Sequence, residues 1–227
     1  IMYPDRQGTY QCFDQVATIK QFAKSSEAVP SFDRIPEMMR RALRKCFEGR
    51  PGVVHIDIPE NIMNTKVKCD IAFWEPHQYR MIELPKASDY QIERTAQLLT
   101  SANFPIIHAG SGVIHSGAKE ELKQVAEKLQ AMVTTSWAGR GALDENNPLA
   151  VSMVHIEANN HVRNDADVVL VLGSRLGETD WWGKAPYWNA SQKVIQVDID
   201  PSILGANKPA ELAIQSDIKA FLQQLLM

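Results

Sequence analysis

The sequence predicts an α/β fold, in which a parallel sheet has helices on both faces and is preceded by part of another α/β domain. From residue 88 onward, apolar runs of strand length alternate with segments whose apolar residues recur at helical spacing. Several of these runs are continuous, which is typical of parallel strands buried on both faces. Glycine-containing turns follow two of them. These observations indicate three layers, helix, sheet and helix.

Composition excludes several classes of protein. The net charge of -3, with Lys and Arg scattered among Asp and Glu, provides no basic surface for nucleic acid. No apolar stretch approaches the roughly 18 residues that cross a bilayer, and no signal-peptide pattern opens the chain, so we expect a cytoplasmic protein without a membrane segment. The cysteines, Cys12, Cys46 and Cys69, are too widely spaced for a disulfide framework or a metal site.

The first region, residues 1–59, reads as the end of an α/β domain. A helix is predicted after Ser31, with Pro36 in its first turn and Gly49 after its end. Its apolar residues at helical spacing are Ile35, Met39, Ala42, Leu43 and Cys46. A short strand over 53–58 then ends at Pro59.

Residues 60–87 are rich in proline and mixed charge and show no sustained period, so we expect an interdomain linker. The chain opens without a helix or strand signal and stops at Met227 inside an apolar helical pattern. We therefore expect it to be a fragment of a longer protein.

The second region, residues 88–227, carries the regular alternation. Ser88 and Gln91 resemble a capping box that opens a helix, and a second helix is expected from near Ser116 and a last one from near Ile218. Strands are predicted over 104–109, 132–135, 167–172 and 193–197. Because parallel strands end at one edge, Gly110, Thr134, Gly173 and Asp198 should lie together where ligands bind such sheets.

Two turns at that edge could contact a phosphate. Gly110-Ser111-Gly112 follows a strand and would let backbone amides approach a diphosphate. It lacks the dinucleotide spacing, however, and a glycine pair of this kind is more often a tight structural turn than a nucleotide loop. Gly173-Ser174-Arg175 repeats the arrangement and adds a cation, which could instead be a solvated arginine. Asp198 and Asp200 could accept ribose hydroxyls or could cap the turn at Pro201.

Aromatic residues and histidines give weaker signals. The cluster Trp181, Trp182, Tyr187 and Trp188 could stack on a flat ring or cover another subunit, although packing within the protein is the more common role. His108 lies inside a strand and is expected to be a core residue. The sequence shows no arrangement for nucleophilic or metal catalysis, so we predict neither catalytic nor metal-binding residues.

Five stretches of the chain resemble one known family of enzymes. Residues 7–15 and 49–59 resemble the end of the pyrimidine-binding domain in the acetolactate synthase and oxalyl-CoA decarboxylase family, whose members depend on thiamine diphosphate. Residues 105–118, 167–176 and 194–201 resemble the opening and later strands of the central domain of that family. The matches follow the family order along nearly the whole chain.

The resemblance implies a six-stranded, nucleotide-binding-like central domain that binds FAD in acetolactate synthase, ADP in oxalyl-CoA decarboxylase, and nothing in several relatives. It implies these cofactor-facing residues: Gly110, Ser111, Gly112, Gly173, Ser174, Arg175, Asp198 and Asp200. Phe104-Pro105 stands where the synthases have Arg-Pro, and Met153–Ile156 where they have Gly-Met-His-Gly; both departures argue against FAD.

The parent enzyme implied by the resemblance is a decarboxylase or carboligase, a lyase or transferase that binds thiamine diphosphate and magnesium. Its partners would be the remaining domains of the parent, in a homodimer or homotetramer. The acidic activator and the Gly-Asp-Gly metal motif of that family do not occur in this sequence. We therefore expect the chain to be inactive alone. The alternatives are a self-contained nucleotide-dependent enzyme or an interaction module on a Rossmann-like fold.

Overall fold

The computed structural model describes Tyr10, residues 13–68 and residues 70–227, and the chain divides into two compact units. Unit 1 is Ile1–Glu83 and unit 2 is Leu84–Met227. Cys12, Cys69 and most of the family-like stretch 7–15 lie outside the described residues. Within the described part, no helix is both long enough and apolar enough to span a bilayer.

Unit 1 is built on a small parallel sheet. Strands β1 and β2 pair in register from Ser25 opposite Val54 to Ala28 opposite Asp57. Gly49 adopts a left-handed φ of 58° just after α2 ends, as its predicted role as the stop requires. The elements are α1 (Gln15–Lys20), β1 (Ser25–Ala28), η1 (Phe32–Arg34), α2 (Ile35–Phe47), β2 (Val54–Asp57), α3 (Glu60–Met63) and η2 (Pro76–Gln78).

The buried face of α2 agrees only in part with the predicted apolar positions: Ile35 packs on the core cluster of unit 1 and Ala42 is buried, but two other positions are exposed. Met38 and Ala42 are buried, whereas Met39 and Leu43 are 42% and 36% exposed. Within the described residues the sheet beside α2 has only two strands, which leaves part of the apolar side of the helix uncovered. Cys46 is half-buried and has a free thiol.

The segment expected to link the domains contains two short helices, α3 and η2. Ile62 of α3 is buried in a cluster with Val29 and Met38, so the start of this segment packs onto the core of unit 1.

Unit 2 is a five-stranded sheet in the order β4-β3-β5-β6-β7, in which every pair is parallel. The Ser88–Gln91 capping box is confirmed and opens α4. The strands are β3 (Pro105–Ala109), β4 (Met132–Thr135), β5 (Val168–Leu172), β6 (Lys193–Asp198) and β7 (Leu212–Gln215). The helices are α4 (Asp89–Thr100), α5 (Ser111–His115), α6 (Lys119–Leu129), η3 (Trp137–Gly139), α7 (Ile156–Asp165), η4 (Glu178–Gly183), η5 (Pro201–Ile203) and α8 (Ile218–Leu226).

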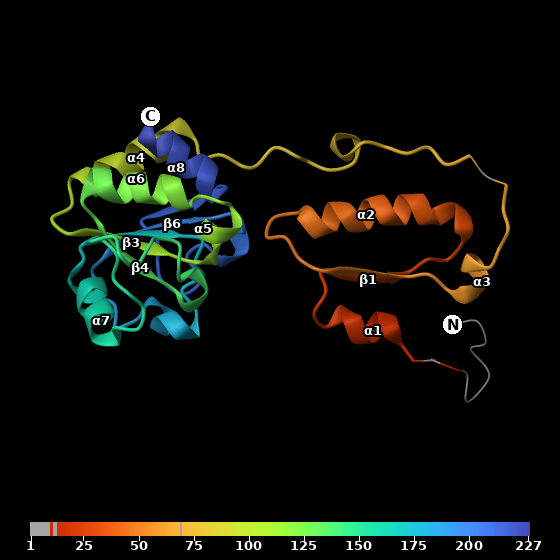
Figure 1. Cartoon of the computed structure of the whole chain (residues 1–227), viewed down its shortest axis with the longest axis horizontal. Helices are drawn as coiled ribbons and strands as arrows, with labels where there is room; N and C mark the ends of the chain where they lie inside the picture. Colours follow the sequence, from red (N-terminus) through yellow and green to blue (C-terminus); the bar gives the residue numbers. More distant parts are fainter. Residues whose placement is uncertain (1–9, 11–12, 69) are drawn as a thin grey trace. The chain divides into compact units, whose positions relative to one another are not determined.

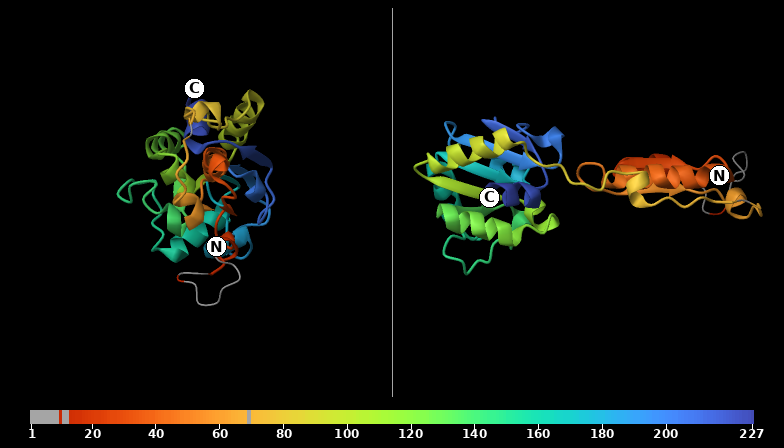
Figure 2. Two further views of the ribbon diagram at one scale, coloured as in Figure 1. Left: turned by 90° about the vertical axis from the view of Figure 1, so that its right-hand side faces the viewer. Right: turned by 90° about the horizontal axis from the view of Figure 1, so that it is seen from above.

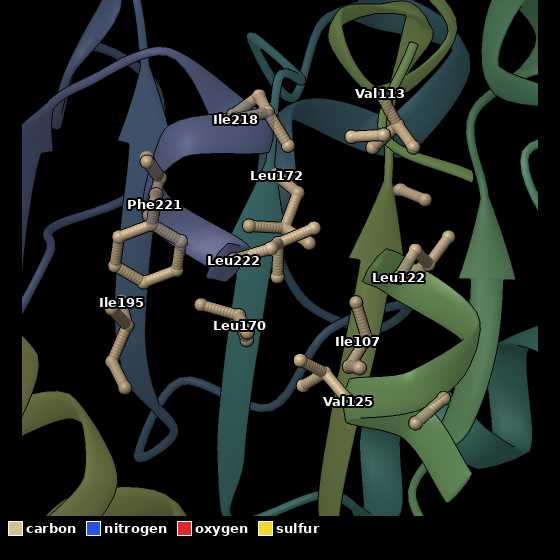
Figure 3. Close-up of a cluster of buried hydrophobic side chains, with 14 of the residues drawn as sticks. Ile107, Val113, Leu122, Val125, Leu170, Leu172, Ile195, Ile218, Phe221 and Leu222 are labelled. Atoms are coloured by element: carbon tan, nitrogen blue, oxygen red, sulfur yellow. The ribbon is translucent and has the colours of Figure 1, made fainter. Parts of the chain in front are cut away.

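One face of this sheet is covered by α4, α6 and α8, with α8 between the other two (Figures 1 and 2). Leu222 of α8 lies beside Leu170 and Leu172 of β5, Phe221 of α8 lies beside Ile195 of β6, and α6 adds Leu122 and Val125 (Figure 3). The side chains of Leu170, Leu172, Phe221 and Leu222 are all fully buried. This layer is the main core of the unit.

The opposite face is covered by α7 and by the loop that follows β5 (Figure 1). Trp188 is fully buried there against Val169 and Val171. The three-layer parallel fold that the sequence predicts is therefore confirmed.

The strand number is five, where the resemblance implied six. Beyond β4, a single parallel bridge joins Val133 to Ala150, with Val133 N donating to Leu149 O and Val151 N to Val133 O. The next amide of this segment that could face β4, Leu149 N, donates to Asn147 Oδ1 at 2.9 Å instead, so the pairing stops at one bridge. The sequence analysis did not predict β7 or α7. β7 buries only Ile214 of its four residues, and α7 buries Asn159 and Arg163 in place of apolar side chains.

Candidate functional site

The direction in which the chain crosses the sheet reverses at β3. From β3 the chain moves outward to β4, then returns to β5 on the other side. The loops that follow β3 and β5 therefore leave the same edge at the topological switch point, where parallel α/β sheets bind ligands. The registers place Gly110, Thr134, Gly173 and Asp198 along this edge, as predicted.

At the switch point the two glycine turns touch backbone to backbone. A Cβ on Gly112 would lie 2.6 Å from Gly173 Cα, and a Cβ on Gly173 would lie 2.5 Å from Gly112 Cα. Gly173 also has φ of 58°, in the left-handed region. A side chain at any of Gly110, Gly112 and Gly173 would overlap the neighbouring loop.

Hydrogen bonds fix this contact. Gly110 N donates to Leu172 O at 2.8 Å, Gly112 N to Gly173 O at 3.1 Å and Gly173 N to Val197 O at 2.9 Å. These three amides are therefore already paired within the protein. The tight structural turn that the sequence left open is present, and Ser111 begins the short helix α5.

Ser174 and Arg175 differ in their surroundings. Ser174 is buried, donates its hydroxyl to Asp180 Oδ2 at 3.3 Å, and accepts from Leu176 N. Arg175 is exposed. Among the described residues, neither Arg175 nor Ser111 has a side-chain hydrogen bond or ion pair. These two side chains remain available to an anionic ligand.

Asp198 and Asp200 shape the turn after β6. Asp198 Oδ1 accepts from Asp200 N at 2.9 Å, and Asp200 Oδ1 accepts from Ser202 N at 2.9 Å. Asp200 thereby caps η5, the structural alternative that the sequence offered. Asp198 is buried at the sheet edge and Asp200 is half-buried.

A buried polar cluster beneath the edge was not predicted. His108 Nδ1 lies 3.0 Å from Thr134 Oγ1, and its Nε2 lies 3.5 Å from Asp180 Oδ1. Arg163 lies 3.8 Å from the same Asp180 oxygen, and its guanidinium donates to Thr135 O. His108 is fully buried, which confirms the prediction that it is a core residue. Its charged neighbours, Arg163 and Asp180, come from segments too distant in sequence to show a pattern.

Burial controls the charges in this cluster. It lowers the pKa of His108, so the ring is neutral at pH 7. Burial would raise the pKa of Asp180, but His108, Arg163 and Ser174 hold it below its ordinary value. Burial also lowers the pKa of Arg163, against the attraction of Asp180, and a guanidinium keeps its proton. Arg163 and Asp180 therefore form the charged pair beside a neutral imidazole.

The tryptophan cluster is split between packing and exposure. Trp188 is fully buried, donates from Nε1 to Asp180 O at 2.8 Å, and meets His108 edge-on. Trp181 stacks on Tyr187 with centroids 4.2 Å apart, yet Trp181 and Trp182 are 42% and 43% exposed. Packing, the more common role, thus accounts for Trp188 and for Tyr187, which packs on the same cluster, whereas Trp181 and Trp182 keep exposed ring surface.

A separate surface groove of about 570 Å³ lies between the start of α6 and the loop after η3. Lys119 and Lys123 line it together with Glu120 and Asp144, so its charge is mixed. Within the described ranges, no group of three or more His, Cys, Asp or Glu could hold a metal ion.

Comparison with known proteins places this geometry in a family. The family model described as the thiamine pyrophosphate enzyme central domain matches residues 92–225, more than half of the chain. A "Probable acetolactate synthase large subunit" from Methanocaldococcus jannaschii is 32% identical over 96% of this chain and 37% of its own length. The oxalyl-CoA decarboxylase of Escherichia coli K12 is 29% identical over 97% of this chain and 38% of its own length.

A similar solved structure is that of a Mycobacterium smegmatis protein considered to be a thiamin diphosphate-dependent enzyme. It matches with a TM-score of 0.72 at 21% identity, over 93% of this chain and 40% of that one, and so supports the fold. The chain spans less than two fifths of the length of the two curated relatives. The family model, which covers unit 2 from α4 to α8, shows that the chain belongs to the thiamine pyrophosphate enzymes and carries their central domain.

Proposed function

We propose that unit 2 is the non-catalytic central domain of a thiamine-diphosphate-dependent decarboxylase or carboligase, and that it binds an adenine nucleotide, FAD or ADP, at its carboxyl edge. The observation that carries the nucleotide proposal is the switch point, where two interlocked turns leave Arg175 and Ser111 without protein partners among the described residues. An exposed guanidinium beside a small hydroxyl suits a diphosphate. Relatives named acetolactate synthase and oxalyl-CoA decarboxylase agree with this enzyme class.

Only some groups at the switch point could contact a nucleotide. The amides of Gly110, Gly112 and Gly173 are paired within the protein, so they would not carry the phosphate contacts. Arg175 would pair with the phosphates, Ser111 would donate its hydroxyl, and Asp198 and Asp200 would accept from ribose at the neighbouring strand end. FAD would bring a flavin ring to the site, and ADP would bind there through its diphosphate. Binding of either nucleotide requires no catalytic group from this chain.

The parent enzyme would supply the chemistry. Thiamine diphosphate and magnesium would bind to its other domains, which are the partners we propose for unit 1. Both strands of the unit 1 sheet have an edge unpaired within the described chain, and α2 exposes Met39 and Leu43. Such features suit packing against further domains or subunits, in a cytoplasmic homodimer or homotetramer.

Nucleotide binding to the purified chain tests the site. Calorimetric titration with ADP and with FAD, together with absorbance at 450 nm of the isolated protein, should detect one bound nucleotide. Arg175→Gln should weaken binding at least tenfold, because a charge-assisted contact is lost. Arg50→Gln, which changes an exposed arginine of unit 1, should bind like the wild type. Absence of binding by the wild-type chain would refute the nucleotide proposal.

A turnover assay tests the non-catalytic role. With thiamine diphosphate, magnesium and pyruvate or oxalyl-CoA, the chain alone should release no carbon dioxide above background. Turnover would refute this part of the proposal. Hydrolysis of a bound nucleotide would instead favour the alternative of a self-contained nucleotide-dependent enzyme.

A further inference from the structure

The loop after β5, residues 177–190, is attached to the segment after β6 by a buried lysine. Lys208 is only 6% exposed, and its Nζ donates to Gly183 O at 3.0 Å and to Asn189 O at 2.9 Å. Within the described chain no carboxylate forms an ion pair with it, and burial alone lowers the pKa of its ammonium. Burying an ammonium group without an ion-pair partner is unfavourable, so stabilisation of the fold does not by itself account for a lysine at position 208.

A second set of contacts holds the start of the same loop. Asn207 Nδ2 donates to Arg175 O at 2.9 Å and to Leu176 O at 3.0 Å. Gln196 of β6 donates to Ser174 O at 3.1 Å. Asn207 thus holds the residues that lead into loop 177–190, and Lys208 holds the middle and the end of that loop.

Between these anchors the backbone is strained. Trp181 and Trp182 have φ of 53° and 50°, in the left-handed region that residues with a Cβ rarely adopt. Their side chains are 42% and 43% exposed, so burial does not offset the strain. Strain of this kind persists only where the surroundings enforce it, and it is concentrated at functional sites.

We propose that Lys208 is a positioning residue that, with Asn207, holds loop 177–190 so that Trp181 and Trp182 offer a stacking surface to the planar ring of the bound nucleotide. The identity of the ligand rests on the proposed function, whereas the anchoring of the loop does not. Aromatic side chains stack readily on flat rings, and Arg175, two residues before the loop, would pair with the phosphates of the same ligand.

The test compares two lysine variants in the full chain. Lys208→Met removes the anchor, and Lys184→Met changes an exposed lysine of the same loop as the matched control. Hydrogen exchange of residues 177–190 measures the anchoring without any ligand. Titration with ADP and FAD, monitored by tryptophan fluorescence, measures the effect on the site.

We expect Lys208→Met to speed exchange in the loop at least tenfold, leave α4 and α6 protected, and weaken nucleotide binding at least tenfold. Lys184→Met should match the wild type, and Lys208→Arg should restore part of both properties. Unchanged exchange in Lys208→Met would overturn the anchoring. Faster exchange with unchanged affinity would overturn the stacking role.

If wild type and variants alike bind neither nucleotide, the proposed function and the stacking role fail together, while the exchange data still decide the anchoring. Should Lys208→Met fail to fold, Asn207→Ala removes the contacts to Arg175 and Leu176 and is judged by the same two measurements.

Discussion

The close backbone contact between the turns after β3 and β5, here called the interlock, predicts how much stability three glycine-to-alanine substitutions cost. The three glycines rank differently because alanine is unfavourable at each of them for a different reason. Gly117 has φ of 66° but open space around it. Gly110 has an ordinary φ of -91°, yet its Cβ would lie 2.7 Å from Ser174 Cα. Gly173 combines φ of 58° with a Cβ 2.5 Å from Gly112 Cα.

The magnitudes follow from these differences. The left-handed backbone costs alanine about 1–2 kcal/mol. Alanine regains about 0.4–1 kcal/mol by stiffening the unfolded chain. Overlap with a neighbouring backbone costs about 1–3 kcal/mol. The free energy of unfolding should therefore fall by on the order of 1 kcal/mol for Gly117→Ala, about 1–2 kcal/mol for Gly110→Ala and about 2–4 kcal/mol for Gly173→Ala.

Urea unfolding followed by tryptophan fluorescence measures these losses. Trp74 is the one tryptophan of unit 1, and the other four are in unit 2, so the signal reports mainly the unit that contains the glycines. Equal losses for Gly117→Ala and Gly173→Ala would refute the interlock, as would a neutral Gly110→Ala.

Three further predictions concern the core and the buried cluster. Asp180→Asn should lower the free energy of unfolding by about 3–5 kcal/mol, because it leaves the Arg163 charge buried without its partner; Glu178→Gln, an exposed change in the same loop, should stay within about 0.5 kcal/mol. If both variants unfold alike in urea, the ion pair is not stabilising. The pKa of His108 is lowered on folding from 6.5, so below that pH the unfolded chain takes up a proton that the folded chain refuses. Stability should fall with decreasing pH by up to about 1.4 kcal/mol per unit, and His108→Gln should lose that slope in urea titrations at pH 7 and 5.5; an unchanged slope would contradict the assignment. Leu222→Ala, which empties a fully buried site, should cost about 2–5 kcal/mol in the same assay, and a loss under about 1 kcal/mol would show that the core collapses around the gap.

The parallel α/β fold could be predicted from the sequence because the strands of unit 2 are local apolar runs. Val168–Leu172 needs no distant information to be identified as a buried strand, and the Ser88–Gln91 capping box is a contact between residues three apart. The edge that carries Gly110, Gly173 and Asp198 follows from the parallel arrangement alone. Membership of the thiamine pyrophosphate enzymes was also readable from the order of the motifs.

Only the tertiary structure decided what the residues at that edge do. Whether Gly112 faces a ligand or a neighbouring backbone depends on how closely the turn after β5 approaches it, and that distance is not encoded near Gly112. The same holds for the charge pair of Arg163 with Asp180, whose partners meet only when α7 and the loop after β5 pack on one face of the sheet. Local periodicity therefore determined the elements and their direction, whereas contacts between segments distant along the chain determined which polar groups are free to bind.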